Sequence, residues 1–351
     1  MSRCIQLARN GFYGAAPNPM VGAVIVHDGK IIGEGYHVRC GGPHAEVNAI
    51  RSVGNPELLK ESTIYVSLEP CSHYGKTPPC ADLIVEKGIP RVVVGCMDPF
   101  AKVAGRGIRK LQEAGIEVTV GVLETECLAL NRRFITFHTH RRPYITLKWA
   151  ESADGFMDGL RTDYEKEKPY AFSTPYTRML VHRCRAGHQA ILVGRQTALA
   201  DNPLLNLRLW PGKSPLRLVV DRNGSLPKHL ALFNDGAETR VYLDALSVHP
   251  LYGEQAGVTC VRLDFSRDIL PQILDDLYHL SVQSLLVEGG RRLLESFISA
   301  GLWDEIRVEQ SPVWLKEGVP SPSWPHGRIR TTEVERHLLV HILSSRGSSA
   351  V

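Results

Sequence analysis

Short apolar runs that suit β-strands alternate with amphipathic stretches that suit α-helices along most of this chain. This alternation is typical of α/β proteins, in which helices pack on the faces of a largely parallel sheet. It comes in two series, the first ending near residue 123 and the second starting at Tyr144. With 351 residues, the chain also exceeds the size of one ordinary core. We therefore predict two α/β domains, residues 1–140 and residues 144–351, with the tail beyond about residue 318 left unplaced.

The first series opens with an amphipathic stretch over residues 2–10, followed by a hairpin that turns at Asp28 and Gly29. It continues as the helix H-A-E-V-N-A-I-R-S-V, the strand S-T-I-Y-V-S-L-E-P-C, the helix A-D-L-I-V-E-K-G, the strand R-V-V-V-G-C-M-D-P, the helix I-R-K-L-Q-E-A-G and the strand I-E-V-T-V-G-V. This order of elements predicts a layered α/β domain.

The second series contains strands and helices but no G-x-G-x-x-G dinucleotide fingerprint. Its predicted strands are Y-I-T-L-K-W-A, A-I-L-V-G, R-L-V-V-D, R-V-Y-L-D, V-T-C-V-R-L-D, S-L-L-V-E-G-G and E-I-R-V-E-Q-S-P, and its helices lie near residues 175–187, 269–279 and 291–300. The glycine turn in V-E-G-G-R-R feeds a strand into a helix. It suits either a phosphate at the helix N-terminus or a tight β–α connection.

The amino-acid composition excludes few classes of protein, but it indicates where this protein is found and what it binds. The net charge of +4 suits anionic small molecules without requiring nucleic acid or a membrane. No apolar run approaches the ~18 residues of a spanning helix, and the first residues lack a signal-peptide core. We therefore expect a cytoplasmic protein with reduced thiols. Of the eight cysteines, six have no partner at metal spacing and are interpreted as buried small apolar residues: Cys4, Cys40, Cys96, Cys127, Cys184 and Cys260.

The stretch N-R-R-F-I-T-F-H-T-H-R-R-P-Y between the two series is rich in Arg and His. One interpretation is a patch that binds a nucleic-acid backbone. The favoured one is a solvated connector between domains that includes a terminal helix.

Four residues of the first series form a constellation with metal chemistry. His44 and Glu46 stand in H-A-E at a helix start, and Cys71 and Cys80 stand in P-C-S-H-Y-G-K-T-P-P-C. One imidazole and two thiolates are ligands that zinc prefers, and three protein ligands leave a fourth position for water. Helix N-termini near both cysteines favour the thiolate form.

A zinc ion at these residues would lower the pKa of its water from ~15.7 toward ~7. Glu46, two residues after His44, would then carry a proton to a leaving amine. H-x-E followed by P-C-x-x-C is the pattern of zinc deaminases that act on nucleobases, although eight residues separate the two cysteines here. A closed structural site with His73 as fourth ligand is the competing hypothesis.

The runs H-A-E, E-P-C-S-H-Y-G-K-T-P-P-C and D-P-F-A-K-V-A-G-R-G-I together resemble the RibD family of bifunctional riboflavin-biosynthesis enzymes. In that family a deaminase is fused to a reductase, and the long spacing between cysteines fits it. The resemblance covers about residues 1–315. It implies a cytidine-deaminase-like three-layer domain followed by a dihydrofolate-reductase-like α/β domain.

For the first domain, the resemblance implies removal of the 2-amino group of 2,5-diamino-6-ribosylamino-4(3H)-pyrimidinone 5′-phosphate. It places the zinc ligands at His44, Cys71 and Cys80, and the proton shuttle at Glu46. The implied substrate contacts are Asn18, His37, His73 and Lys76. An asparagine offers a donor and an acceptor to a ring edge, and a lysine offers a charge to phosphate.

For the second domain, the resemblance implies NADPH-dependent reduction of the ribosyl group to a ribityl chain. The matched runs include Y-I-T-L-K-W-A-E-S-A-D-G and L-V-E-G-G. The implied cofactor contacts are Ala150, Thr197, Asp201 and Gly290, and the implied substrate contacts are Arg185, Leu205, Arg208 and Glu288. Lys148 and Asp154 lie near the expected hydride-transfer site without an assigned role. The loop from Gly155 to Tyr170 is longer and more charged than the family pattern.

Two other functions remain as alternatives at this stage. A deaminase acting on tRNA would use the basic residues of 131–143 to hold the backbone. A zinc-stabilised scaffold would use the metal without chemistry. The favoured hypothesis has a small phosphorylated pyrimidine as substrate and zinc and NADPH as cofactors, expects no nucleic-acid or membrane partner, and allows a homo-oligomer.

Overall fold

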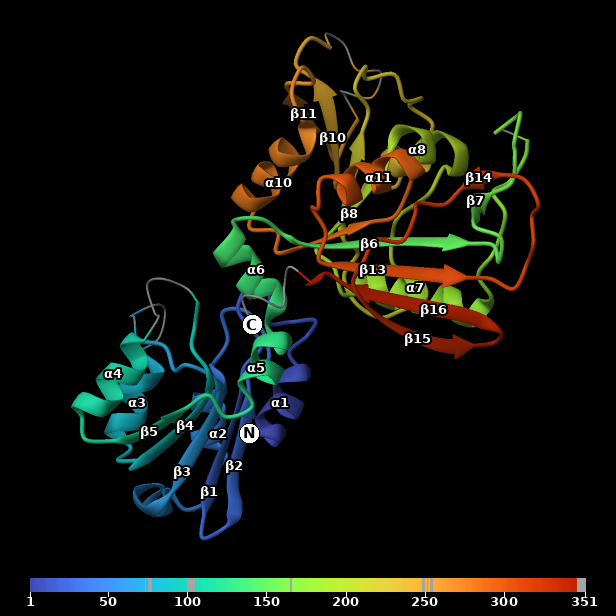
Figure 1. Cartoon of the computed structure of the whole chain (residues 1–351). Helices are drawn as coiled ribbons and strands as arrows, with labels where there is room; N and C mark the ends of the chain where they lie inside the picture. The colour runs from blue at the N-terminus through green and yellow to red at the C-terminus, as the bar shows by residue number, and fades with distance from the viewer. Residues whose placement is uncertain are drawn as a thin grey trace. The chain divides into compact units, whose positions relative to one another are not determined.

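The computed structural model describes residues 1–72, 74, 78–99, 105–164, 166–247, 250, 252 and 255–345. The chain divides into two compact units, Met1–Arg141 (unit 1) and Arg142–Ala350 (unit 2). Each unit is built on one main sheet with helices on its faces (Figure 1). Among the described residues, no helix combines the length and the apolar character needed to cross a bilayer.

Unit 1 contains a five-stranded sheet in the order β2-β1-β3-β4-β5. The strands are β1 (Gly22–His27), β2 (Lys30–Tyr36), β3 (Thr63–Leu68), β4 (Arg91–Cys96) and β5 (Glu117–Val120). β1 pairs antiparallel with β2 and β3, whereas β3, β4 and β5 are parallel. The predicted hairpin turn is confirmed: Asp28 and Gly29 have φ of 46° and 71°, the positive values that a two-residue turn of this hand requires.

Helices cover both faces of this sheet, which confirms the three-layer architecture (Figure 1). On one face lie α2 (Ala45–Arg51), α3 (Cys80–Glu86) and α4 (Arg106–Glu113), and on the other lie α1 (Ser2–Arg9) and α5 (Glu124–Leu130). The short 3-10 helix η1 (Pro56–Glu61) leads into β3. Small residues on α2 and α3 let these helices pack closely on the sheet, where Ala45, Ala49 and Ala81 are fully buried.

The helix predicted within the connector of residues 131–143 is confirmed, but the expectation that this stretch is solvated is wrong. Residues Arg132–His140 form α6, and Phe134, Ile135 and Phe137 on it are buried. The many basic side chains drew attention away from the apolar residues of this helix, which share one face and are buried. One cysteine prediction also fails, since Cys40 is exposed in the loop after β2, and Cys260 is only half-buried.

Unit 2 contains a nine-stranded sheet in the order β11-β10-β9-β8-β12-β6-β13-β16-β15. The strands from β11 to β13 in this order are parallel, and β16 and β15 close one side as an antiparallel hairpin. Their bounds are β6 (Tyr144–Glu151), β8 (Ala190–Gly194), β9 (Leu216–Val220), β10 (Thr239–Asp244), β11 (Val258–Leu263), β12 (Ser284–Val287), β13 (Glu305–Gln310), β15 (Arg328–Val334) and β16 (His337–Leu343).

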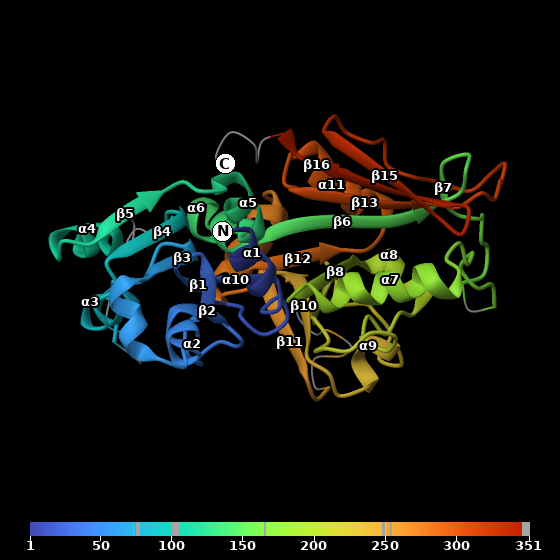
Figure 2. The same ribbon diagram turned by 90° about the horizontal axis from the view of Figure 1, so that it is seen from below.

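The helices of unit 2 divide between the two faces of the sheet according to the alternation of side chains along each strand. On β8, Ala190 and Leu192 join the core under α10 (Ile269–His279) and α11 (Arg291–Ser299). Ile191 and Val193 join the core with α7 (Pro175–Ala186), α8 (Arg195–Asp201) and α9 (Ala231–Asn234). The two faces can be followed in Figure 2. Both faces are covered, as is usual for a parallel sheet.

The chain beyond residue 318, which the sequence left unplaced, completes the sheets of unit 2. Residues Val319–Pro320 form β14, which pairs with β7 (Phe156–Asp158). β16 pairs with β13 along its whole length and buries Val340 and Ile342 in the core. This tail is therefore part of the folded unit.

Candidate functional site

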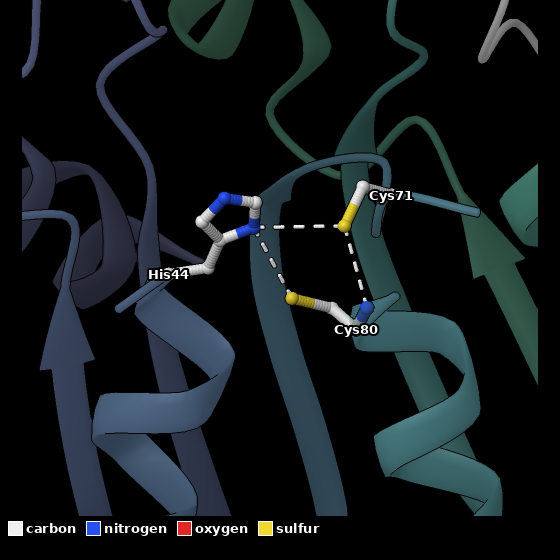
Figure 3. Close-up of side chains that lie close together, drawn as sticks. All are labelled: His44, Cys71 and Cys80. Carbon is white, nitrogen blue, oxygen red and sulfur yellow. Dashed lines mark hydrogen bonds between the residues drawn. The ribbon is translucent and has the colours of Figure 1, made fainter. Parts of the chain in front are cut away.

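Three potential zinc ligands meet where α2 and α3 begin, on the same face of the unit 1 sheet. His44 immediately precedes α2 in extended backbone, with φ −71° and ψ 166°. Cys71 follows β3, and Cys80 is the first residue of α3, directly after Pro79, whose φ of −58° already suits a helix start. Figure 3 shows α2 and α3 starting at the same level, so that all three side chains point into one space.

The separations between these ligand atoms fit zinc. Nδ1 of His44 lies 3.5 Å from Sγ of Cys71 and 3.3 Å from Sγ of Cys80 (Figure 3). Zinc bonds of ~2.0–2.1 Å to nitrogen and ~2.3 Å to sulfur place tetrahedral neighbours roughly 3.5–3.8 Å apart. Within the described ranges, this is the one group of three or more His, Cys, Asp or Glu ligands close enough to share an ion. Three ligands of these types suit a catalytic zinc site with a fourth, open position.

The electrostatics of the site favour a thiolate at Cys71. Hydrogen bonds from the thiol of Cys80 and from His44 lower the pKa of Cys71 to about 4. The backbone N–H of Cys80 also donates to Sγ of Cys71 across 3.3 Å. The hydrogen bond with the Cys71 sulfur, followed by burial, raises the pKa of the Cys80 thiol. The hydrogen bond with Cys71 likewise raises the pKa of His44. Because the thiolate is the form of cysteine that binds metal, a stabilised Cys71 thiolate favours binding of a cation at this site.

Glu46 points into the same space from the first turn of α2. Its side chain is buried, and the residue is 3% exposed. Burial, and then the Cys71 thiolate, raise the pKa of the carboxyl group to about 7, while His44 opposes the shift. The thiol of Cys80 is hydrogen-bonded to this carboxyl group. A carboxyl group with this pKa exchanges its proton near neutral pH.

Two of the predicted substrate contacts lie beside the zinc ligands. Nδ1 of His37 lies 3.0 Å from the carbonyl oxygen of Pro43, which can only accept a hydrogen bond, so this nitrogen carries the proton. Nε2 of His37 therefore accepts from Nδ2 of Asn18, 3.1 Å away. Burial lowers the pKa of His37 and favours this neutral form. The ring of His37 meets that of His44 edge-on, with centroids 5.4 Å apart. The other two predicted contacts, His73 and Lys76, lie outside the described residues.

Sequence reasoning missed two buried side chains that hold the loops of this site. Asn131, at the start of α6, makes two hydrogen bonds to the backbone of Met20, two residues after Asn18. Glu69, two residues before Cys71, accepts hydrogen bonds from four backbone N–H groups, those of Asp98, Gly105, Gly107 and Ile108. The E-P-C motif could have drawn attention to Glu69. No local sequence pattern distinguishes Asn131 from other asparagines.

In unit 2, the predicted substrate contacts gather around one ion pair. The guanidinium of Arg185 on α7 binds the carboxylate of Glu288 after β12, with a shortest distance of 2.6 Å. Despite burial, the charge of Arg185 keeps the pKa of Glu288 below its usual range. Arg185 also donates to the backbone carbonyl of Asn206, and the side chain of Asn206 accepts from Arg208. Leu205 is buried with a positive φ of 51°, which turns this loop toward α7.

Sequence reasoning also missed His182, one turn before Arg185 on α7. Its Nδ1 accepts the backbone N–H of Arg208 at 3.1 Å, and the residue is 2% exposed. A histidine on a helix carries no distinctive pattern, so only the fold identifies it.

Two of the predicted cofactor contacts, Thr197 and Gly290, meet at the glycine turn after β12. A side chain at Gly289 would put a Cβ 2.8 Å from Cγ2 of Thr197, and one at Gly290 would put it 3.2 Å from the Thr197 hydroxyl. Gly290 also has a φ of 79°, which favours glycine. This bare backbone at the start of α11 fits the approach of a phosphate group. Ala150 is half-buried on β6.

Asp201, the fourth predicted cofactor contact, is held by the charged loop between β7 and α7. Arg161 of that loop lies between Asp158 and Asp201, and its side chain is 7% exposed. Its guanidinium also donates to the backbone carbonyl of Ala200 at 2.8 Å. The loop that departs from the family pattern is therefore anchored on α8.

Asp154 anchors another loop. Its carboxylate accepts the backbone N–H groups of Leu315 and Lys316 at 3.1 Å and 2.7 Å. These bonds and one from Ser152 outweigh desolvation and lower the pKa of Asp154. The group is therefore ionised at neutral pH. Lys148, half-buried on β6, favours the ionised form of Glu288 by its charge.

Comparison with protein families matches each unit to a different model. Residues 1–96 match the cytidine and deoxycytidylate deaminase zinc-binding region, which includes His44, Glu46, Cys71 and Cys80. Residues 143–335 match the RibD C-terminal domain. The second match argues against the alternative hypothesis, in which the chain is a tRNA deaminase with a non-catalytic second domain.

Similar proteins align along nearly the whole chain. The riboflavin biosynthesis protein RibD of Aquifex aeolicus (strain VF5) is 40% identical over 321 residues, covering 91% of this chain and 88% of its own. That of Escherichia coli (strain K12) is 37% identical over 331 residues, covering 90% and 87%.

Two solved structures are similar to this chain over both units. The diaminohydroxyphosphoribosylaminopyrimidine deaminase/5-amino-6-(5-phosphoribosylamino)uracil reductase of Thermotoga maritima is 37% identical with a TM-score of 0.85, covering 98% of this chain and 97% of its own. Acinetobacter baumannii RibD is 31% identical with a TM-score of 0.84, covering 97% of both chains. Because both halves match and the alignment runs through the region that joins them, this chain belongs to the RibD family of riboflavin biosynthesis proteins.

Proposed function

We propose that unit 1 hydrolyses the 2-amino group from 2,5-diamino-6-ribosylamino-4(3H)-pyrimidinone 5′-phosphate, with water as the other reactant and ammonia as the product. The observation that carries this proposal is the meeting of His44, Cys71 and Cys80 beside the buried carboxyl group of Glu46. The name of the Thermotoga maritima relative, a deaminase and reductase of phosphoribosylated pyrimidines, supports the choice of substrate.

His44, Cys71 and Cys80 would hold the zinc ion. When bound, zinc supplies the Lewis acidity that activates water at neutral pH. Glu46 takes a proton from the attacking water and passes it to the leaving amine, so that ammonia departs as a neutral molecule. A pKa of about 7 suits both transfers. The charge of a bound cation lowers this value, because it favours the carboxylate.

Asn18 and His37 would orient the pyrimidine ring. Nδ2 of Asn18 donates to His37, and its side-chain oxygen would accept a hydrogen bond from a ring N–H. The fixed tautomer of His37 keeps this amide from flipping, because Nε2 can only accept. We assign the substrate's phosphate to Lys76 and a further substrate contact to His73, following the family pattern.

For unit 2, we propose reduction of the ribosyl group of the deaminated product, in its ring-opened form, to a ribityl chain. NADPH, when bound, supplies the hydride. Thr197 and Gly290, with Ala150 and Asp201, would bind the cofactor, and the close approach of Thr197 to the glycine turn supports this role. Arg185 and Arg208 would bind the phosphate, while Glu288 fixes the orientation of Arg185. Leu205 would line the pocket.

The ionised state of Asp154 opposes a role as proton donor in the reduction. Both of its oxygens accept backbone N–H groups, and protonation would remove one of these bonds. We infer that Asp154 holds the loop after β13 in place. Replacing it with Asn should leave the pH dependence of kcat for reduction unchanged.

The substrate is a small pyrimidine, and we propose that the enzyme meets it in the cytoplasm, without a nucleic-acid or membrane partner. The cysteines of the described residues are all free thiols, which suits a reducing compartment. Cell fractionation with an antibody against the native chain tests this location, and size-exclusion chromatography with light scattering tests for a homo-oligomer.

The decisive experiment is Glu46→Gln in the full-length zinc-loaded protein. This amide cannot accept and return a proton, so ammonia release should fall about 10²–10⁴-fold while zinc content stays at one per chain. NADPH oxidation with the deaminated intermediate should be unchanged. If Glu46→Gln released ammonia at the wild-type rate, the proposed role of Glu46 would be wrong and the zinc ion would be a structural element only.

A further inference from the structure

His182 connects two parts of the proposed reductase site that are distant in sequence. It lies on α7 one turn before Arg185, and its Nδ1 accepts the backbone N–H of Arg208 at 3.1 Å. Arg208 belongs to the irregular segment between α8 and β9. The contact therefore ties the loop that carries one guanidinium to the helix that carries the other.

The surroundings of His182 keep its ring neutral. It is 2% exposed, and the charged groups that act on it are Arg178, Arg185, Arg208 and Glu288. Burial, followed by the charges of Arg185 and Arg208, lowers its pKa to about 4, and Glu288 opposes this only partly. A neutral imidazole that accepts at Nδ1 must carry its proton on Nε2. The acceptor is therefore available to the Arg208 N–H throughout the neutral pH range.

Two hydrogen bonds near Arg208 lie within the loop itself. The Arg208 side chain donates to Asn206, and the Leu207 N–H donates to the hydroxyl of Ser214. These bonds shape the loop but do not fix its distance from α7. Contacts with three residues of α7 tie the loop to this helix. Arg185 donates to the Asn206 carbonyl at 3.4 Å, the Arg208 N–H donates to His182, and the guanidinium of Arg183 lies 5.4 Å from the centroid of the Trp210 ring. The contact to His182 is the shorter of the two hydrogen bonds, and it is the one made by Arg208 itself.

We propose that His182 is a positioning residue of the reductase, which sets the spacing between Arg185 and Arg208 for the substrate's phosphate. This inference rests on the proposed function, in which both arginines bind that phosphate. Two forked cations bind one anion well only at a matched separation, because bidentate hydrogen bonds are directional. Losing the His182 acceptor leaves the Arg208 N–H without its partner and frees the loop.

The experiment compares His182→Asn, His182→Gln and His182→Leu in the full-length protein. An Asn side chain can place its oxygen where Nδ1 lies, whereas a Gln oxygen reaches the position of Nε2. We expect His182→Leu and His182→Gln to raise KM for the deaminated intermediate about tenfold to a hundredfold, with kcat and KM for NADPH within about threefold. His182→Asn should restore KM. Ammonia release by unit 1 serves as the internal control for intact protein.

Arg208→Gln separates failure of this inference from failure of the proposed function. If Arg208→Gln raises KM but His182→Leu does not, the loop is positioned without His182 and the inference is wrong. If Arg208→Gln leaves KM unchanged, the proposed phosphate site itself is wrong. A lower Tm for His182→Leu with unchanged KM would show a purely structural histidine and also overturn the inference. Failure of His182→Asn to restore KM would do the same, provided that its Tm matches wild type.

Discussion

The side-chain amide of Asn131 makes a two-point contact with the backbone of Met20. Its Oδ1 accepts the Met20 N–H at 2.8 Å, and its Nδ2 donates to the Met20 carbonyl at 2.9 Å. Asn131 is 3% exposed, so water does not compete for these bonds. The contact joins the start of α6 to the A-P-N-P loop, which presents Asn18 to the zinc site. Asn131 therefore ties the start of α6 to the loop that holds Asn18, the proposed contact to the pyrimidine ring.

Asn131→Ala should impair deamination more than it impairs folding. Removing the amide leaves two partly buried backbone groups of Met20 without these partners, at up to about 1–3 kcal/mol each, and lets the loop move. We expect KM for the diaminopyrimidine to rise at least tenfold and the Tm of unit 1 to fall. Asn131→Asp keeps the acceptor for the Met20 N–H but loses the donor, and should lie between wild type and Asn131→Ala. Equal ammonia release by all three proteins would show that the loop needs no such support.

Removal of zinc should abolish one activity and spare the other. Dialysis against a chelator should eliminate ammonia release and leave NADPH oxidation with the deaminated intermediate intact, because the three ligands all belong to unit 1. Cys71→Ser should lose the metal as well, since it removes one of three ligands. The exposed Cys40→Ser is the matched control and should retain one zinc per chain. Deamination that survives complete metal removal would exclude the zinc mechanism.

Arg161→Gln should destabilise unit 2 and weaken cofactor binding. The side chain of Arg161 is 7% exposed between Asp158 and Asp201, but that of Asp201 is 35% exposed, so solvent screens part of the cluster. We therefore expect removal of the guanidinium to cost about 1–3 kcal/mol. Without the guanidinium, the two carboxylates repel and the loop loses its anchor on α8. We expect a lower Tm and a higher KM for NADPH. Lys166→Gln, in the same loop but 84% exposed and paired with Asp163, should change neither value.

His182 should make the stability of unit 2 sensitive to mild acid. Its pKa is about 4 in the folded chain and 6.5 ordinarily, so between these values the unfolded chain binds more protons. Stability therefore rises with pH across this window, and the contribution is lost as pH falls from 7 toward 4. At pH 5 the loss is about 2 kcal/mol. Urea unfolding of wild type and His182→Asn at pH 7 and pH 5 measures it, and an equal pH effect in both proteins would contradict the assignment.

Much of the fold follows from local sequence patterns, and the places where prediction failed have local causes. The helices over residues 175–187 and 269–279 were predicted to within about two residues, because apolar positions recur at helical spacing. The C-terminal hairpin was missed because its turn is made by Glu335 and Arg336, both with positive φ. Such turns are normally marked by Gly, Asn or Asp, and here that signal is absent.

The residues of the zinc site could be proposed from sequence because ligand chemistry restricts residue type. A histidine and a glutamate in H-A-E, together with two cysteines of which the second follows P-P at a helix start, are best explained by a metal site. Asn131, His182 and Arg161 lacked any such restriction. Each acts by bonding to backbone or carboxylate groups that are far away in sequence, and an asparagine, histidine or arginine suits many surface positions equally well. Only the folded chain identifies their partners.

The order of strands in unit 2 affects how this protein reaches its native state. β6 is made first, yet its two neighbours in the sheet are β12 and β13, so the intervening residues from 152 to 283 must be synthesised before its edges are paired. Closing such long loops before any contact forms is entropically costly and slows folding. In unit 1, β1 pairs with β2 across a two-residue turn. We therefore expect the deaminase half to become protease-resistant on the ribosome while the reductase half still depends on chaperones.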